Sequence, residues 1–307
     1  MKRHNRKRNA KFVEQEAKPA ASGKKHAFFS KALKFFSQGW GLYVIPLALV
    51  LLYYPLELAP YSAMLGLLCF LSMAYIIVAD MKPTKAETKD ISKPLWELAK
   101  TLGIALAAWV IVCIILQTGK PMNVVTSCSM LPVLHRGDLV FLQGGQINAP
   151  TVQITSSLKA TDITYVNCTA NFFNGSAVNV PCISSVRAGA KEFPARTQND
   201  IIIYDAEPTA YGAIIHRSVL WLNAGNQSFL LTKGDNNAVL DQQSGISPVT
   251  ADRINGKVIL TVPALGYLKV FLFAGFDFIL RLPTGDLQYA LSAFDAPAGC
   301  DYVLSAN

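Results

Sequence analysis

The sequence has few charged residues for its length. Of its 307 residues, 16% are Asp, Glu, Lys or Arg and 51% are hydrophobic, with a mean hydropathy of +0.30. A soluble domain carries about 25% charged residues, so this chain has too little polar surface for an ordinary soluble protein. The same composition excludes a collagen, a coiled coil, a wholly disordered chain and a small disulfide-stapled protein.

Acidic residues are scarce at the N-terminus. Residues 1–38 hold 11 of the 28 lysines and arginines but only two glutamates, a net charge of +9, whereas residues 39–307 have a net charge of −1. The excess of positive charge therefore lies in an N-terminal arm, which we interpret as a topology signal of a membrane protein. The body lacks the basic excess that nucleic-acid binding on a folded surface requires, so no nucleic-acid partner is predicted.

Three segments lack charged residues altogether: residues 39–56, 61–79 and 101–119. Each approaches the roughly 20 apolar residues that a helix needs to cross a bilayer core about 30 Å thick. We predict three transmembrane helices that form an anchor over residues 39–120, with a connecting loop at 80–100. The lipid bilayer is accordingly a predicted partner.

Lysine and arginine are unevenly distributed around these spans, and their distribution predicts the orientation of the chain. The arm holds 11 and loop 80–100 holds five, whereas the turn at 57–60 holds none. We therefore place the arm and this loop in the cytoplasm and everything after the third span on the other side. The predicted location is the cell membrane, or the endoplasmic reticulum membrane in a eukaryote, as a multi-pass protein with an extracytoplasmic body.

Helical periodicity is missing from residues 121–268, which consist of short Val-, Ile- and Leu-rich runs broken by Gly, Pro, Asn and Asp. Runs of this length are typical of β-strands. The predicted strands lie at 139–143, 201–204, 213–223, 227–232 and 255–262. The fold class is therefore a membrane-anchored, mainly β protein, whose catalytic domain at 121–268 carries a polar insertion at 144–199 and is followed by a C-terminal segment at 269–307.

A fourth apolar stretch, residues 258–280, is interrupted by Lys269 and Asp277. Each charge near the centre of a membrane helix costs about 2.5 to 3.5 kcal/mol on insertion scales. We expect a strand up to Val262 and then a short hydrophobic helix that dips into the outer leaflet. A fourth membrane span over 263–280 is the alternative, and it would place Cys300 and the C-terminal tail in the cytoplasm.

Cysteine is infrequent, with six residues in the chain. Cys69 and Cys113 lie in predicted membrane spans and are expected to be small hydrophobic residues. Cys168 and Cys182 lie in the insertion, which the predicted topology places outside. A disulfide between them would close a loop of about 15 residues and stabilise the fold by about 3 kcal/mol, so we predict this bond.

Histidine is also scarce, and the positions of the four histidines limit the choice of a catalytic base. The segment T-S-C-S-M at 126–130 follows the third span, and a serine hydroxyl becomes a nucleophile when a neighbouring base removes its proton. His4 and His26 belong to the cytoplasmic arm. His135 lies in an apparent turn shortly after the serines and is expected at the surface. His216 is therefore the best candidate base.

An imidazole of pKa near 6.5 can act as a base at neutral pH without the strong desolvation that a lysine base requires. An aspartate bonded to the other ring nitrogen would fix the tautomer and stabilise the imidazolium. Asp235 and Asp241 are the two candidates for this role.

Four motifs occur in order: S-C-S-M-L-P at 127–132, R-G-D at 136–138, a hydrophobic strand ending in H-R at 216–217, and K-G-D-N-N at 233–237 with a second Asp six residues after the first. Together they resemble the signal peptidase I family of the archaeal and endoplasmic-reticulum type. The resemblance covers about 122–143 and 199–268. The three-helix anchor and the insertion lie outside it.

The resemblance implies a role for each matched residue. Ser129 would be the nucleophile and His216 the general base. Asp241 would orient the histidine, while Asp235 would hold the site together or share that role. The backbone N–H of Ser129, helped by the Ser127 hydroxyl, would stabilise the oxyanion of the tetrahedral intermediate.

The resemblance also implies roles for other residues of the motifs. Met130 and Pro132 are expected to contact substrate, and no metal or cofactor is implied. The histidine occupies the position where bacterial members of the family carry lysine, so Lys233 is expected to be structural. Two residues depart from the family pattern: Cys128 replaces the usual glycine, as a tolerated small residue, and Leu131 stands where Glu is frequent.

The predicted function is a membrane-bound serine endopeptidase that removes N-terminal signal peptides from secreted preproteins, cleaving after small residues at −1 and −3. Its predicted partners are these signal peptides, with the protein translocation channel as a further candidate. Two alternatives stay open: a catalytically silent subunit of the secretion machinery that binds signal sequences, and a membrane peptidase for another class of precursor.

Overall fold

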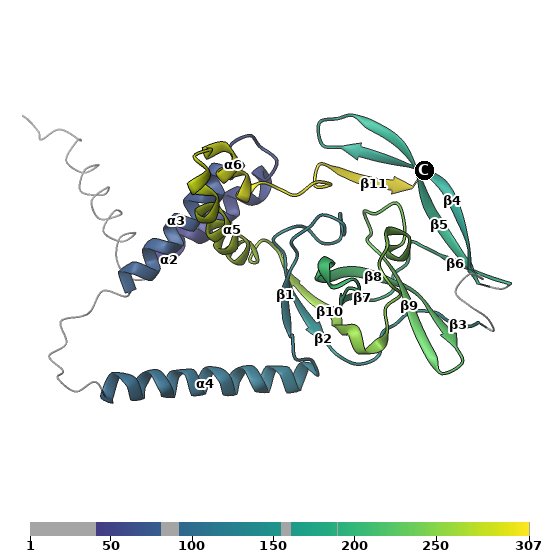
Figure 1. Ribbon diagram of the computed structural model, residues 1–307, viewed down its shortest axis with the longest axis horizontal. Helices are drawn as coiled ribbons and strands as arrows, with labels where there is room; N and C mark the ends of the chain where they lie inside the picture. The colour runs from purple at the N-terminus through teal and green to yellow at the C-terminus, as the bar shows by residue number, and fades with distance from the viewer. Residues whose placement is uncertain (1–40, 81–91, 155–160, 189, 307) are drawn as a thin grey trace, which may run out of the picture. The chain divides into compact units, whose positions relative to one another are not determined.

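The computed structural model describes residues 41–80, 92–154, 161–188 and 190–306 (Figure 1). The chain divides into two units, Met1–Ile45 and Pro46–Asn307. Of the first unit, only the beginning of helix α2 is described. The predicted basic arm and most of the predicted cytoplasmic loop lie outside the described residues.

Three apolar helices precede the β-strands: α2 (Gly41–Tyr53), α3 (Ser62–Asp80) and α4 (Ser92–Leu116). Two of them, over Ser62–Ala79 and Leu95–Leu116, are long and apolar enough to cross a membrane. Helix α2 has 13 residues and passes into a short 3₁₀ helix at Tyr54–Leu56, so its described part is shorter than a span. The prediction of spans is therefore supported by length and composition for two of the three segments.

Seven strands form the main sheet, in the order β1 (Met122–Val124), β2 (Leu139–Gln143), β10 (Ile254–Val262), β7 (Ile201–Asp205), β8 (Ala213–Ala224) and β3 (Thr151–Gln153), with β9 (Gln227–Lys233) also paired to β8. All pairs are antiparallel except β3 with β8. The five predicted strands are confirmed, each within one residue at either end. The body of the protein is therefore mainly β.

The core below the serine segment is built from both the sheet and the loop that carries the serines. Met130 and Leu134 of this loop pack on Val140 and Leu142 of β2 and on Ile203 of β7. Met130 is 1% exposed, and full burial of such a side chain stabilises a fold by about 1.5–3 kcal/mol. The loop is thus fixed to the sheet from beneath.

The insertion supplies most of a second sheet, in the order β11 (Tyr302–Ala306), β4 (Thr161–Phe172), β5 (Ala177–Ala188) and β6 (Lys191–Pro194) (Figure 1). The hairpins expected for the insertion are present. The insertion does not form a separate unit, because its strand β3 pairs with the main sheet and its own sheet includes β11 from the C-terminal tail. The end of the tail, predicted as a separate segment, is therefore part of the β structure.

The contacts of the C-terminal segment argue against the alternative of a fourth membrane span. Helix α5 (Tyr267–Arg281) has 15 residues and is followed by the short helix α6 (Leu287–Leu291). The chain then returns to the β domain, where Cys300 is disulfide-bonded to Cys128 and β11 pairs with β4. A span over 263–280 would separate these partners across the bilayer.

A buried ion pair connects the turn after α2 to the R-G-D motif. Arg136 Nη1 lies 2.7 Å from Glu57 Oε1 and 3.1 Å from the Tyr53 hydroxyl. The side chains of Arg136 and Glu57 are 5% and 16% exposed. A charge at this depth is tolerated because its partner and hydrogen bonds compensate for the lost hydration.

Replacing Arg136 with methionine should lower the free energy of unfolding by about 3–5 kcal/mol, because Glu57 would stay buried without a partner. Thermal unfolding of the full chain in detergent measures the effect. Lys120→Met is the matched control, since the Lys120–Asp205 pair is about half exposed and is expected to contribute about 0–1 kcal/mol. Equal losses in the two variants would contradict a buried pair at Arg136.

Candidate active site

Three side chains from distant parts of the chain lie next to one another. Ser129 lies in the loop after β1, His216 in β8, and Asp241 at the start of a 3₁₀ helix (Asp241–Ser244) after β9. Ser129 Oγ is 2.9 Å from His216 Nε2, and His216 Nδ1 is 2.7 Å from Asp241 Oδ2. The structure thus joins the predicted serine, histidine and one of the two candidate aspartates in a single hydrogen-bonded row.

The side chain of Asp241 is buried, with 2% of its surface exposed, and three hydrogen bonds hold it in place. Its Oδ2 accepts from the Tyr204 hydroxyl at 2.8 Å and the Thr232 hydroxyl at 2.6 Å, besides its contact with His216. Burial by itself raises the pKa of the Asp241 carboxyl, but the charge of His216 and these hydrogen bonds outweigh it, so its pKa lies below the ordinary value. Asp241 is therefore ionised at neutral pH.

An ionised Asp241 determines the tautomer of the histidine. The Nδ1–H donates to the carboxylate, which leaves Nε2 to accept the Ser129 proton. In this arrangement the imidazole can take up a proton from the serine, and the Asp241 carboxylate stabilises the resulting imidazolium.

Asp235 lies elsewhere and has a different partner. Its carboxylate accepts from Arg217 Nε at 2.8 Å and Nη2 at 2.6 Å, and Arg217 Nη1 also donates to the Asn199 carbonyl. Adjacent strand residues point to opposite faces of a sheet, so His216 and Arg217 of the H-R motif contact different groups: His216 contacts Asp241, and Arg217 contacts Asp235. Of the two roles expected for Asp235, the contacts fit holding the structure together and not a bond to His216.

The K-G-D-N-N segment clamps the backbone of the serine loop. Asn236 N–H donates to the Ser129 carbonyl at 2.7 Å, and Asn236 Nδ2 donates to the Cys128 carbonyl at 3.2 Å. A Cβ at Gly234 would lie 2.6 Å from the Ser129 carbonyl oxygen, so only glycine permits this approach. The motif therefore acts on the position of Ser129 through the backbone.

A cleft of about 420 Å³ opens in front of Ser129 and His216. Its walls are two extended segments, residues 123–127 and 213–215, and Ser127 Oγ lies 3.3 Å from Ser129 Oγ. Of the two predicted substrate contacts, Met130 borders the cleft. Pro132 does not line it and lies instead in a separate pocket with Arg217 and Asp235.

The expectation for Cys128 is corrected by the structure. Cys128 is neither a free thiol nor a tolerated replacement for glycine: it forms a disulfide with Cys300, 172 positions away. Leu131 packs against the same disulfide, so both departures from the family pattern belong to one buried cluster. The structure also pairs Cys168 with Cys182, while Cys69 and Cys113 are free.

The pairing predicts how many thiols react. Protein unfolded without reductant should expose two thiols, Cys69 and Cys113, and six after reduction. Changing both Cys128 and Cys300 to alanine should lower the free energy of unfolding by about 5 kcal/mol, because their bond closes a loop of more than 100 residues. The same change at Cys168 and Cys182 is the control and should cost about 3 kcal/mol. Labelling of Cys128 and Cys300 before reduction, located by mass spectrometry, would contradict the bond between them.

The sequence did not point to Tyr204 and Thr232, which hold Asp241. Thr232 directly precedes the K-G-D-N-N motif, and Tyr204 lies opposite Ile214 in the strand that pairs with β8. Their proximity to motif residues is the one sequence feature that could have indicated that they belong to the site. The residue types themselves are common in strands and carry no mark of a site.

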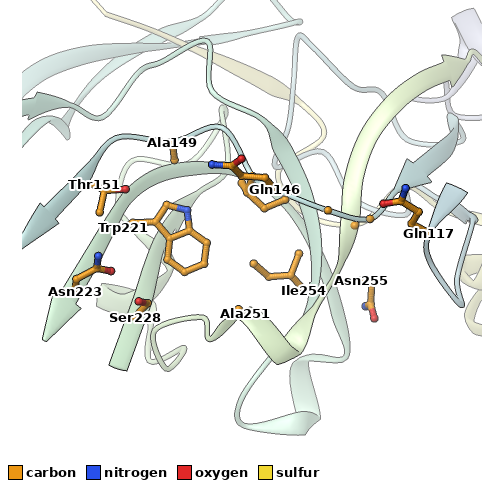
Figure 2. A pocket seen from close by; sticks show the side chains of 14 residues that line it. Gln117, Gln146, Ala149, Thr151, Trp221, Asn223, Ser228, Ala251, Ile254 and Asn255 are labelled. Atoms are coloured by element: carbon orange, nitrogen blue, oxygen red, sulfur yellow. The ribbon is translucent and has the colours of Figure 1, made fainter. Parts of the chain in front are cut away.

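A larger pocket, of about 520 Å³, lies elsewhere and shares no lining residue with the cleft (Figure 2). Figure 2 shows Trp221 beside Ile254 and neutral polar side chains such as Gln146 and Asn223. No charged residue lines it, so it offers no acid or base. No group of three or more metal-ligating side chains occurs within the described ranges.

No family model matches the chain. It is, however, similar to proteins named signal peptidase complex catalytic subunit SEC11. The relative from Verticillium alfalfae is 26% identical over 174 residues, 56% of this chain and 74% of the relative. The relatives from Colletotrichum graminicola and Neurospora crassa are 24% identical over 195 and 190 residues, which cover 62% and 61% of this chain and 87% and 84% of the relatives.

These matches agree with the motifs and confirm, at low identity, the resemblance to signal peptidase I of the archaeal and endoplasmic-reticulum type. The chain is thus similar, at low identity, to proteins named as catalytic subunits of signal peptidase complexes.

Proposed function

We propose that this chain is a membrane-bound serine endopeptidase that removes N-terminal signal peptides from secreted preproteins. The observation that carries the proposal is the hydrogen-bonded row of Ser129, His216 and Asp241 at the cleft, in a chain whose relatives are named catalytic subunits of signal peptidase complexes. The motifs that resemble the family supply the same three residues.

The proposed mechanism is an acyl transfer to serine. Ser129 Oγ attacks the carbonyl carbon of the scissile bond while His216 Nε2 takes its proton, and the histidine then gives the proton to the leaving amine. Asp241 stabilises the imidazolium, with Tyr204 and Thr232 holding its carboxylate in place. The backbone N–H of Ser129 and the Ser127 hydroxyl stabilise the oxyanion. The mature protein leaves with the new amine. Water then gives a proton to His216 and attacks the acyl carbonyl carbon, and as the bond to Ser129 Oγ breaks, His216 returns the proton to Oγ and the signal peptide leaves with a free carboxyl group.

The proposed specificity is for small residues at −1 and −3. An extended substrate lying between segments 123–127 and 213–215 would direct alternate side chains, and so −1 and −3 together, toward the same wall. Branched or bulky side chains border this space at Val125, Ile215 and Met130. A small substrate side chain fits such a shallow site, whereas a larger one would collide with it.

The proposed topology has residues 39–120 in the membrane as three helices, with the arm 1–38 in the cytoplasm and the catalytic domain outside. Helix α4 supports it, because its apolar side chains are exposed on every face and it leads directly into β1. The two disulfides also support it, since such bonds persist in oxidising compartments. Substrates would reach the cleft as they leave the translocation channel.

Cleavage of a preprotein by the purified full chain in detergent tests the proposed function. We expect a cut after an Ala-x-Ala junction, located by mass spectrometry of the new N-terminus, and loss of that cut when −1 is changed to leucine. A chain that binds the preprotein but never cuts it would be a silent subunit. Equal cleavage of the leucine substrate would indicate a peptidase for another class of precursor.

A further inference from the structure

A second groove, of about 340 Å³, borders the catalytic cleft. It lies between the end of β1 and helix α5, and Val124, Thr126 and Lys269 line both the groove and the cleft. A chain bound across Ser129 therefore has a surface to follow when it leaves the cleft at this end. We call this surface the α5 groove.

One face of α5 forms the α5 groove. Its lining residues on the helix begin at Lys269 and end at Asp277, with Val270, Phe273 and Ala274 between them. The spacing of i, i+1, i+4, i+5 and i+8 is that of a single helix face. Eight residues of helix rise about 12 Å, so the floor is an apolar strip of that length with a charged residue at each end.

Resting on the proposed function, we propose that the α5 groove binds the apolar stretch that precedes the cleavage site of a signal peptide. A signal peptide carries an apolar region of about 7–15 residues followed by the small-residue cleavage site. The groove offers matching surfaces side by side: an apolar strip that meets the catalytic cleft at Lys269. About eight helical residues would cover its length, which falls within that range.

The mode of binding would be a helix lying against an apolar groove, with contacts repeated every three to four residues. Phe273 is the main exposed contact, with 61% of its surface accessible. The opposite side of α5, at Phe271 and Gly275, is buried against α3 and the segment after α6. The α5 groove is therefore open on a helix that is itself firmly held.

A third face of α5 provides a matched control. Phe276 is 56% exposed but does not line the groove, so it is comparable to Phe273 in size and exposure. If α5 serves only to lie in a lipid surface, loss of either phenylalanine should have the same effect. If the groove binds the substrate, only Phe273 should matter for substrate affinity.

The test compares full-length Phe273→Ser and Phe276→Ser in detergent, on a preprotein and on a short peptide that contains the cleavage site without the apolar stretch. We expect Phe273→Ser to raise KM for the preprotein about 10- to 100-fold with kcat kept, because it loses the burial of one aromatic side chain. Phe276→Ser should match wild type. On the short peptide the difference between wild type and Phe273→Ser should disappear.

The other outcomes overturn the inference in distinguishable ways. If all three proteins cut the preprotein with the same KM, or if both variants are impaired alike, the α5 groove does not bind the apolar stretch although the peptidase is real. If wild type cuts neither substrate, the proposed function fails and the inference fails with it.

Discussion

Changing His216 to alanine should reduce kcat for preprotein cleavage by about 10⁶-fold. Ser129 Oγ has its hydrogen-bond partner in His216 Nε2 at 2.9 Å, and without that base the hydroxyl keeps its proton at neutral pH. His216 is 6% exposed within a strand, so the variant needs a folding check by thermal unfolding. The measurement is single-turnover cleavage in detergent, with wild type and variant at equal concentration.

Lys233→Met is the control for this prediction, because a lysine is the other residue type that can activate serine in such enzymes. Burial lowers the pKa of Lys233 to about 8, but its Nζ donates to the Gly234 carbonyl at 2.9 Å. Methionine fills a similar volume, and we expect cleavage to be kept. If Lys233→Met were inactive while His216→Ala still cut the preprotein, the base would be the lysine.

Changing Asp241 to asparagine should reduce kcat by about 10⁴-fold while the fold is kept. The amide can still bond to Nδ1, but it favours the tautomer with the proton on Nε2, which cannot accept from Ser129. The loss should show in kcat with little change in KM, because Asp241 is 2% exposed and does not touch the substrate cleft.

Asp235→Asn is the matched variant, since both aspartates belong to the same segment and were candidates for the same role. Asp235 pairs with Arg217, so its replacement should lower the free energy of unfolding and leave kcat within about tenfold of wild type. A larger loss of kcat for Asp235→Asn than for Asp241→Asn would reverse the assignment of the two carboxylates.

Acid should destabilise the protein through Asp241. Its pKa in the folded chain lies below the value of about 3.9 in an unfolded chain, so the unfolded state binds a proton first as the pH falls. The stabilisation is complete above the unfolded pKa and is lost as the pH falls through the folded one. In Asp241→Asn this part of the acid dependence should be absent.

Local patterns were sufficient to predict the strands and two of the side chains that the structure brings together, Ser129 and His216. The five strands could be predicted from short apolar runs that end at turn residues, because this signal lies within a few consecutive residues. Ser129 and His216 could be found because the motifs keep their chemistry within a few residues. The choice between Asp235 and Asp241 needed the structure, since both lie in one turn-rich segment and only the fold decides which faces the histidine.

Contacts between distant residues could not be predicted in this way. Cys128 and Cys300 are 172 positions apart, and nothing in either local sequence marks the other as its partner. The same holds for β11, which pairs with β4 across more than 130 positions. The described part of the first apolar segment is shorter than a span, because α2 gives way to a 3₁₀ helix at Tyr54–Leu56, where Pro55 interrupts the α-helix.

Covalent labelling shows directly whether Ser129 is the nucleophile. The full chain in detergent is treated with a serine-directed phosphonate, and the modified residue is located by mass spectrometry of its peptides. We expect one adduct, on Ser129, in wild type and none in His216→Ala. An adduct on Ser127 or on another serine, or preprotein cleavage that continues after complete labelling of Ser129, would contradict it.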